Sequence, residues 1–413
     1  MNAAYIIDIT RTPVGKYGGA LSGIRPDDLL ARAISSLVSR NRCLDINSIE
    51  DVIAGDANQA GEDTRNVARM ASLLAGLPVT VAGNTVNRLC ASGLQAIMDA
   101  GRAIQCGEGE VYIAGGVESM SRAPFVIGRA DYKSGKIAGN AFDTTIGWRF
   151  TNPELAKRYY PFNMGETAEN VAAEWNITRE EQDAYAFDSH RKFFEALEAD
   201  KWKEEITPME ITDARLFGSG QHSELLANGV ELISMDEPPR RITLEKLAAL
   251  KPAFLENGTV TAGNSSGLND GSAAMLLASE AAIKKYGFEP MARIVSMAVA
   301  GVDPSIMGMG PVPAVKKALQ RAGLTLGDID LIEMNESFAA QSIACIRELK
   351  ADINRVNVNG GSIAIGHPLG CSGVRISATL LYEMKRRKAK YGLAALCAGL
   401  GQGVAVIYEN LQA

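Results

Sequence analysis

Hydrophobic residues along the chain fall into two patterns. Short continuous runs end at glycine or turn residues, as buried strands do. These runs include 52–54, 111–113, 331–332 and 404–407. Between them, apolar residues over 94–104 form one helical face that ends at Gly107, and those over 315–322 form another that ends at Gly323. The alternation of strands and helices predicts an α/β fold.

The chain also contains an internal repeat. Residues 48–61 resemble 327–341, and residues 85–116 resemble 364–399. Both copies follow the order strand, glycine-rich loop, helix, strand. Gene duplication is the simplest explanation, and it predicts two similar α/β domains whose equivalent loops face a shared cleft.

The repeat divides the chain into an N-terminal half over 1–270 and a C-terminal half over 271–413. Residues from 121 to about 250 interrupt the repeated order, and they are rich in charged and aromatic side chains. A helical pattern runs from Thr178 to Trp202 within them. We interpret this region as an inserted loop domain that covers the cleft. The alternative is a plain elaboration of the surface.

Length, charge and the distribution of apolar residues indicate a globular protein that neither binds nucleic acid nor spans a membrane. The 413 residues suffice for two or three domains, and the net charge of −6 offers no global positive field for nucleic acid or an anionic membrane. A phosphate-bearing ligand would need a local basic cluster. No apolar run approaches the roughly 18 residues of a membrane span, and the N-terminus lacks the basic region of a signal peptide. Six irregularly spaced cysteines indicate reduced thiols, so we expect a cytoplasmic protein.

Cys90 is the first candidate for chemistry. It ends an extended stretch, and a helical pattern begins immediately afterwards at Ser92 and Gly93. A helix N-terminus favours a thiolate, so this position predicts a lowered thiol pKa and a nucleophile. The alternative is a small buried hydrophobic residue, as most free cysteines are.

Three histidines are present. His190 and His222 lie in charged or polar stretches, which predicts solvated surface positions. His367 differs because it lies among glycines and before Pro368, in a loop that leads into a helix. In the repeat it falls opposite Asn87, three residues before Cys90. We therefore expect a thiol and an imidazole to face one another, although a structural histidine is the alternative.

Cys397 follows an apolar strand and precedes a glycine-rich turn, which would expose it at the end of the strand. A buried core cysteine is the alternative, and Cys371, four residues after His367, is a rival thiol. The glycines of 399–403 precede a strand, so they predict a tight hairpin and not a dinucleotide-binding loop. No spacing of His, Cys and carboxylate residues suggests a metal site.

Seven ordered segments resemble the signature motifs of thiolases and together span almost the whole chain. They read VNRLCASG, GGVESMSRAP, MGETAENVA, VTAGNSSGLNDG, NESFAAQ, GGSIAIGHPLGCSG and CAGLGQG. The resemblance implies the thiolase fold, a five-layered α-β-α-β-α core of two duplicated halves with an inserted loop domain. It also implies a homodimer or a homotetramer.

The resemblance assigns roles at matching positions. Cys90 matches the acylated nucleophile, His367 the base that activates it, and Cys397 a second acid and base. Asn335 matches the residue that holds a water in an oxyanion hole, and the N–H groups of Cys90 and Gly399 match a second one. Positions that resemble contacts to coenzyme A are Ser266, Met164, Arg240, Phe254 and Ala262. Ser337 stands where the family usually has alanine.

The implied activity is CoA-dependent cleavage of a 3-oxoacyl-CoA, or the reverse Claisen condensation. Coenzyme A would be a co-substrate, with no tightly bound cofactor. Residues 59–70, SRAPFVIGRAD and 143–150 resemble thiolases that convert 3-oxoadipyl-CoA into succinyl-CoA and acetyl-CoA, and Arg149 is a candidate partner for the terminal carboxylate. Alternatives are an acetoacetyl-CoA or fatty-acid 3-ketoacyl-CoA thiolase, a ketoacyl synthase of the same fold, and an inactive acyl-CoA-binding or assembly subunit.

Overall fold

A computed structural model describes residues 2–129, 132–133, 136–137, 139–212, 223–226 and 229–412. Strands of the main sheet are β1 (Tyr5–Arg11), β2 (Gly15–Lys16), β3 (Ile49–Gly55), β4 (Ala82–Val86), β5 (Val111–Ser119), β13 (Asn269–Ala278), β14 (Ala292–Gly301), β15 (Leu331–Met334), β16 (Tyr391–Ala398) and β17 (Gln402–Asn410). Their helices are α1 (Pro26–Arg40), α2 (Val67–Leu74), α3 (Ser92–Cys106), α8 (Glu280–Tyr286), α9 (Pro311–Ala322), α10 (Ala339–Leu349), α11 (Ser362–Ile365) and α12 (Ser372–Arg387).

The main sheet consists of two parts with matching strand orders. On one side the order β3, β5, β13, β1 has one parallel step followed by two antiparallel ones, and on the other β15, β16, β17, β14 does the same. Only two residue pairs, Tyr5 with Arg293 and Ile6 with Ala292, join β1 to β14. The matching order agrees with a duplication. The expected boundary after residue 270 falls within β13, a strand of the first part, so the exact division of the chain stays a prediction.

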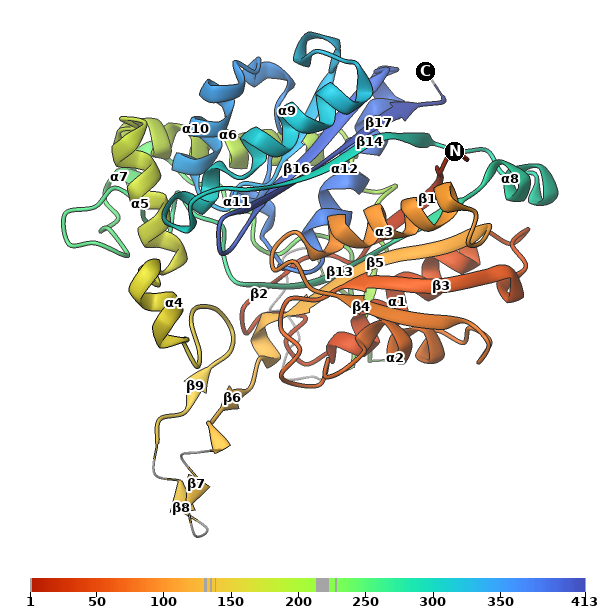
Figure 1. Ribbon diagram of the computed structural model, residues 1–413, viewed down its shortest axis with the longest axis horizontal. Coiled ribbons are helices and arrows are strands. Elements are labelled where there is room, and N and C mark those ends of the chain that lie inside the picture. Colours follow the sequence, from red (N-terminus) through yellow and green to blue (C-terminus); the bar gives the residue numbers. More distant parts are fainter. Residues whose placement is uncertain are drawn as a thin grey trace.

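Helices separate and cover the two parts of the sheet, which confirms the predicted α/β architecture. Helices α3 and α12 lie between the parts and share one core with both, as Figure 1 shows. Helices α1 and α2 pack on the outer face of the first part, and α9 and α10 pack on the outer face of the second. The five layers are therefore helix, sheet, helix, sheet, helix.

Glycines allow the two central helices to touch. A Cβ on Gly93 of α3 would lie 2.6 Å from the Gly370 carbonyl oxygen, and one on Gly373 of α12 would lie 2.0 Å from the Leu94 nitrogen. No real side chain tolerates these distances, so both repeats need glycine at this position. The close approach brings the loops that precede α3 and α12 together.

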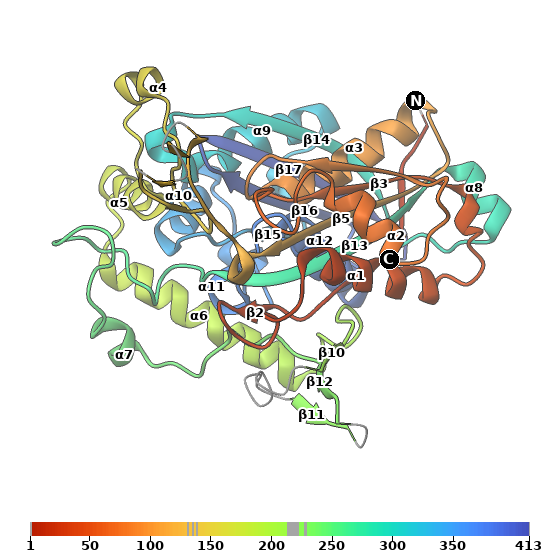
Figure 2. The same cartoon turned by 90° about the horizontal axis from the view of Figure 1, so that it is seen from below.

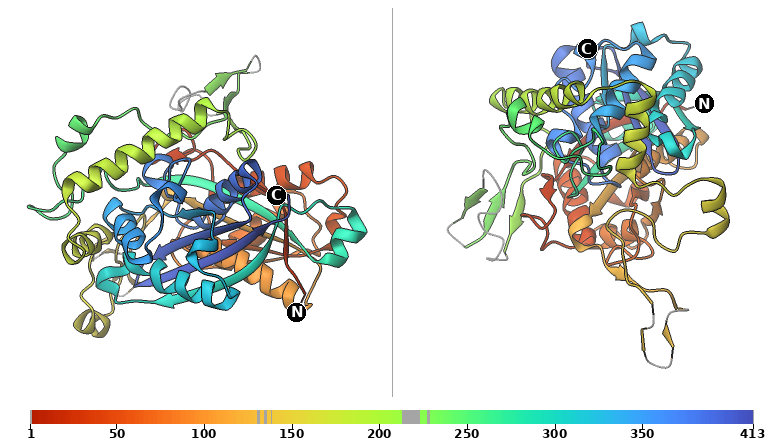
Figure 3. Two further views of the ribbon diagram at one scale, coloured as in Figure 1. Left: turned by 90° about the horizontal axis from the view of Figure 1, so that it is seen from above. Right: turned by 90° about the vertical axis from the view of Figure 1, so that its left-hand side faces the viewer.

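The inserted region has helices that lie toward one end of the layered body (Figure 2). Its helices are α4 (Pro153–Arg158), α5 (Met164–Glu174), α6 (Arg179–Glu198) and α7 (Leu244–Ala248). Its strands are β6 (Phe125–Val126), β7 (Tyr132–Lys133), β8 (Lys136–Ile137), β9 (Phe142–Asp143), β10 (Met209–Ile211), β11 (Ser223–Leu225) and β12 (Glu231–Ile233). The hairpin of β7 and β8 and the sheet of β10–β12 extend from the body in different directions (Figure 3).

Local sequence signals explain several boundaries. The helix predicted over 178–202 is α6, which Thr178 and Glu181 begin with a capping box. The glycine-rich segment 399–403 is a hairpin that joins β16 to β17, as predicted. No helix within the described ranges is long and apolar enough to cross a membrane.

Candidate active site

Cys90 lies in a tight turn between β4 and α3. Leu89 has a φ of 51°, and Ser92 at the start of α3 donates from Oγ to the Leu89 carbonyl oxygen at 2.6 Å. Ser92 Oγ also accepts the Arg88 N–H at 2.8 Å, so a single hydroxyl closes the turn. This local geometry, which the sequence indicates, places the sulfur at the N-terminus of α3.

The prediction of a lowered pKa for Cys90 is wrong. Burial raises the pKa of this thiol to about 12, and the neighbouring Cys397 acts in the same direction. Backbone N–H groups of Gly399 and of Cys90 itself oppose the shift, but desolvation of the thiolate is the larger effect. The resting side chain is therefore a neutral thiol, and it needs a base when it reacts.

His367 lies in the loop between α11 and α12, where it is buried. Its backbone N–H donates to Asn269 Oδ1 at 2.9 Å, and its ring atom Nδ1 lies 2.6 Å from Ser372 Oγ. Ser372 Oγ gives its own hydrogen to the Pro368 carbonyl oxygen at 2.8 Å, so it must accept the hydrogen of Nδ1. This assigns the hydrogen to Nδ1 and leaves the lone pair on Nε2.

The lone pair on Nε2 makes His367 a base. Burial, assisted by the positive charge of Arg375, lowers the pKa of this imidazole to about 3, so the ring is neutral at physiological pH. Cys90 and His367 both line one cavity. The expected thiol and imidazole are thus brought together from the equivalent loops of the two repeats.

Asn335 follows β15 directly and points its amide at His367. Its Nδ2 lies 3.3 Å from His367 Nε2 and donates to Ser337 Oγ at 3.0 Å. Its Oδ1 accepts from Ser362 Oγ at 2.6 Å, and Ser362 in turn accepts from Arg375 Nη2 at 2.6 Å. This chain of buried bonds fixes which side of the amide faces the imidazole.

Cys397 lies in β16 and is fully buried, so the expectation of an exposed thiol at the end of the strand is wrong. Its Sγ lies 3.4 Å from Ser337 Oγ. Burial raises the pKa of the Cys397 thiol, and the contact with the Ser337 hydroxyl opposes that shift. Because Ser337 Oγ accepts a hydrogen bond from Asn335, the hydroxyl hydrogen of Ser337 is available to the Cys397 sulfur. The serine that replaces the usual alanine therefore joins Asn335 to Cys397.

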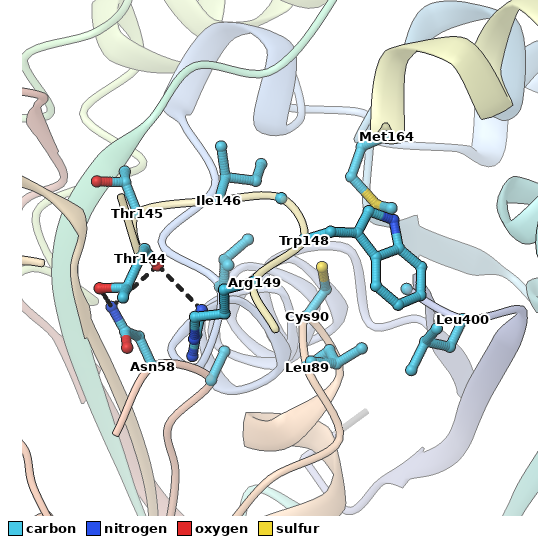
Figure 4. Close-up of a pocket in the computed structure, with 14 residues that line it drawn as sticks. Asn58, Leu89, Cys90, Thr144, Thr145, Ile146, Trp148, Arg149, Met164 and Leu400 are labelled. Carbon is cyan, nitrogen blue, oxygen red and sulfur yellow. Dashed lines mark hydrogen bonds between the residues drawn. The ribbon is translucent and has the colours of Figure 1, made fainter. Parts of the chain in front are cut away.

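Two cavities meet at Cys90. The larger, of about 550 Å³, is lined by His367, Asn163 and Ser337 and by four of the expected CoA positions, Met164, Phe254, Ala262 and Ser266. The smaller, of about 270 Å³, is lined by Ala57, Asn58, Leu89, Cys90, Thr144, Thr145, Ile146, Gly147, Trp148, Arg149, Met164, Leu369, Gly399 and Leu400 (Figure 4). Residues 144–149 of the inserted region thus cover the nucleophile.

Arg240 is not brought together with the other expected CoA positions. It lines a separate cavity with His190, Arg191 and Arg241. The prediction that His190 lies on the solvated surface is wrong, because this residue of α6 is only 2% exposed. Burial lowers the pKa of His190 to about 4, and its Nδ1 accepts the Arg240 N–H at 3.3 Å. His222 lies outside the described residues.

Glu118 is a site residue that the sequence does not single out, although it lies in a recognised motif. Its buried carboxylate accepts N–H groups from Ala57 and Asn58, both at 3.1 Å, and from Gly370 at 2.8 Å. These bonds join the wall of the smaller cavity to the loop after His367. Burial raises the pKa of Glu118 to about 7. Among the described residues, no group of His, Cys, Asp and Glu could hold a metal ion.

Comparisons with known proteins agree with this geometry. The family model "Thiolase, N-terminal domain" matches residues 4–281, and "Thiolase, C-terminal domain" matches residues 288–410. A beta-ketoadipyl-CoA thiolase of Escherichia coli is 50% identical over 414 residues, which cover 100% of both chains. A Bacillus anthracis acetyl-CoA acetyltransferase structure is 42% identical, with a TM-score of 0.90 and coverage of 100% of this chain and 99% of that one. A human mitochondrial 3-ketoacyl-CoA thiolase in complex with CoA is 39% identical, with a TM-score of 0.89 and coverage of 99% and 98%.

Proposed function

The chain belongs to the thiolase family of acyltransferases, and from this premise we propose that it cleaves 3-oxoadipyl-CoA with free coenzyme A to give succinyl-CoA and acetyl-CoA. The observation that carries the proposal is the position of Cys90 where two cavities meet. One cavity contains four of the five expected CoA positions, and the other contains a cationic side chain, Arg149. The 50% identity to a beta-ketoadipyl-CoA thiolase supports the same substrate.

The first half-reaction forms an acyl-enzyme. Cys90 Sγ attacks the C3 carbonyl carbon while its proton passes to Nε2 of His367. The N–H groups of Cys90 and Gly399 are suited to hold the resulting alkoxide, since both already point at the sulfur. The C2–C3 bond then breaks, and its electron pair forms the enolate of acetyl-CoA. Asn335, through a water, and the imidazolium stabilise that enolate.

Protonation completes acetyl-CoA and resets the site. Cys397 gives its proton to C2 of the enolate, and acetyl-CoA leaves. The imidazolium proton then moves to the Cys397 thiolate, which returns both groups to their neutral resting forms. Coenzyme A next loses its thiol proton to His367 as its sulfur attacks the thioester. The departing Cys90 sulfur takes that proton back, and succinyl-CoA is released.

The proposal is tested with the purified wild-type enzyme. Rates of CoA-dependent cleavage are compared for 3-oxoadipyl-CoA, acetoacetyl-CoA and a longer 3-oxoacyl-CoA. We expect the highest kcat/KM with 3-oxoadipyl-CoA, and peptide mass mapping without CoA should place a succinyl group on Cys90. Preference for acetoacetyl-CoA would overturn the substrate, and an acyl group on Cys371 or Cys397 would overturn the nucleophile. Absence of cleavage with all three substrates would favour an inactive acyl-CoA-binding subunit.

The likeness to a thiolase solved with CoA supports acyl-CoA and CoA as partners of this chain. Coenzyme A is a co-substrate in the proposed reaction, which requires no tightly bound cofactor. A homodimer or homotetramer stays a prediction of the family resemblance, and a cytoplasmic location stays a prediction of the cysteine pattern.

A further inference from the structure

The smaller cavity beside Cys90 contains an unusual cation. Among the described residues that line it, Arg149 is the only one with a charged side chain, and most of its neighbours are apolar. With the residues that the structure describes, the guanidinium makes a single hydrogen bond, from Nη1 to the Thr144 carbonyl oxygen at 3.4 Å. No ion pair involves Arg149 in the part of the chain that the structure describes, so most of its five donors are available to an anionic ligand.

The loop that carries Arg149 is fixed at both ends. Asn58 Nδ2 donates to the carbonyl oxygen of Thr144 at 3.1 Å and to its Oγ1 at 3.0 Å. Thr144 Oγ1 donates to the Pro124 carbonyl oxygen at 2.6 Å, and Trp148 Nε1 donates to that of Phe162 at 3.0 Å. Figure 4 shows Arg149 lying beside Asn58 on the wall of the cavity into which the Cys90 sulfur points. The loop that carries Arg149 is thus held in place before substrate arrives.

We propose that Arg149 binds the terminal carboxylate of a short dicarboxylic acyl group on Cys90 and so determines the substrate specificity of the enzyme. This inference rests on the proposed thiolase function. A succinyl group has three carbon–carbon bonds, so its carboxylate carbon lies about 4 Å from the thioester carbon. A planar guanidinium pairs with a carboxylate through two parallel hydrogen bonds, a geometry that a methyl terminus cannot reproduce.

Phosphate groups of coenzyme A are the other anions that could meet this arginine. Arg149 does not line the larger cavity. Of the four expected CoA positions there, Phe254, Ala262 and Ser266 line the larger cavity alone, and Met164 lines both. We therefore assign the larger cavity to coenzyme A and the smaller one to the end of the acyl chain.

The test compares two substrates of equal chain length. The acyl chain of 3-oxoadipyl-CoA ends in a carboxylate, and that of 3-oxohexanoyl-CoA ends in a methyl group. Variant Arg149→Met keeps the apolar stem and removes the charge. We expect the ratio of kcat/KM for the two substrates to fall at least tenfold in this variant. Arg158→Met is the matched control, since Arg158 is an exposed residue at the end of α4. It should leave the ratio unchanged.

A second measurement needs no carbon–carbon cleavage. Succinyl-CoA and butyryl-CoA each acylate Cys90 in the absence of acetyl-CoA, and the rates are followed by intact-protein mass. Arg149→Met should slow transfer of the succinyl group at least tenfold relative to the butyryl group. Equal losses on both donors, as expected if Arg149 contacts a CoA phosphate or only stabilises the loop, would overturn the inference. A wild-type enzyme without preference for 3-oxoadipyl-CoA would instead overturn the proposed substrate.

Discussion

Replacing Ser372 by alanine tests the assignment of the imidazole hydrogen. The Ser372 hydroxyl is the acceptor, at 2.6 Å, that holds the hydrogen of His367 on Nδ1. Without it, either the buried Nδ1–H loses its partner, or the hydrogen moves to Nε2 and faces the Asn335 amide, itself a donor. In the second case the base that accepts the Cys90 proton is lost.

The magnitude follows from the cost of an unsatisfied buried donor, about 1–3 kcal/mol. At about 1.4 kcal/mol per factor of ten, Ser372→Ala should lower the rate constant for acylation of Cys90 by roughly 10–100-fold. The assay is a single-turnover acylation with 3-oxoacyl-CoA in the absence of free coenzyme A. The rate of CoA-dependent cleavage should fall in parallel.

Ser377→Ala provides the matched control. Ser377 is a second buried serine of α12, and it donates to the Gly373 carbonyl oxygen at 2.8 Å, much as Ser372 does to Pro368. Both variants should lose similar stability in thermal unfolding, but only Ser372→Ala should lose acylation rate. Equal acylation rates in the two variants would refute the assigned tautomer and its role in catalysis.

Two further predictions concern protons elsewhere. Ser337→Ala removes the hydroxyl beside Cys397, so the pKa of that thiol should rise further. Exchange of the acetyl-CoA methyl protons with deuterated solvent should then slow about threefold to tenfold, because one hydrogen bond is lost. Unchanged exchange, measured by NMR, would contradict this prediction. His190 has a folded pKa of about 4, below the unfolded value near 6.5, so its contribution to stability is present above pH 6.5 and is lost as pH falls toward 4. The free energy of unfolding, measured by denaturant titration, should fall between pH 7.5 and 5 in both proteins. The fall should be about 2 kcal/mol smaller in His190→Gln than in the wild type. Equal falls would mean that the His190 imidazole is charged in the folded protein.

The sequence alone determined the features that depend on near neighbours. The helix that begins after Cys90, the hairpin at 399–403 and the capped helix α6 follow from turn residues, glycines and caps within a few positions, and the structure contains each of them. The repeat also predicted that the loops of Cys90 and His367 meet. That prediction succeeded because equivalent loops of duplicated units occupy equivalent places.

The tertiary structure decided burial and hydrogen-bond partners. His190 lies in a charged stretch, yet segments distant in sequence bury it. Residues of the insertion and of the hairpin after β16 line the cavity beside the Cys90 thiol, whose pKa is raised there. The tautomer of His367 and the lack of a carboxylate partner for Arg149 among the described residues likewise depend on which groups fold against them. Desolvation and hydrogen bonding act over a few ångströms in space between residues far apart in the chain, so a local pattern of residue types carries no record of them.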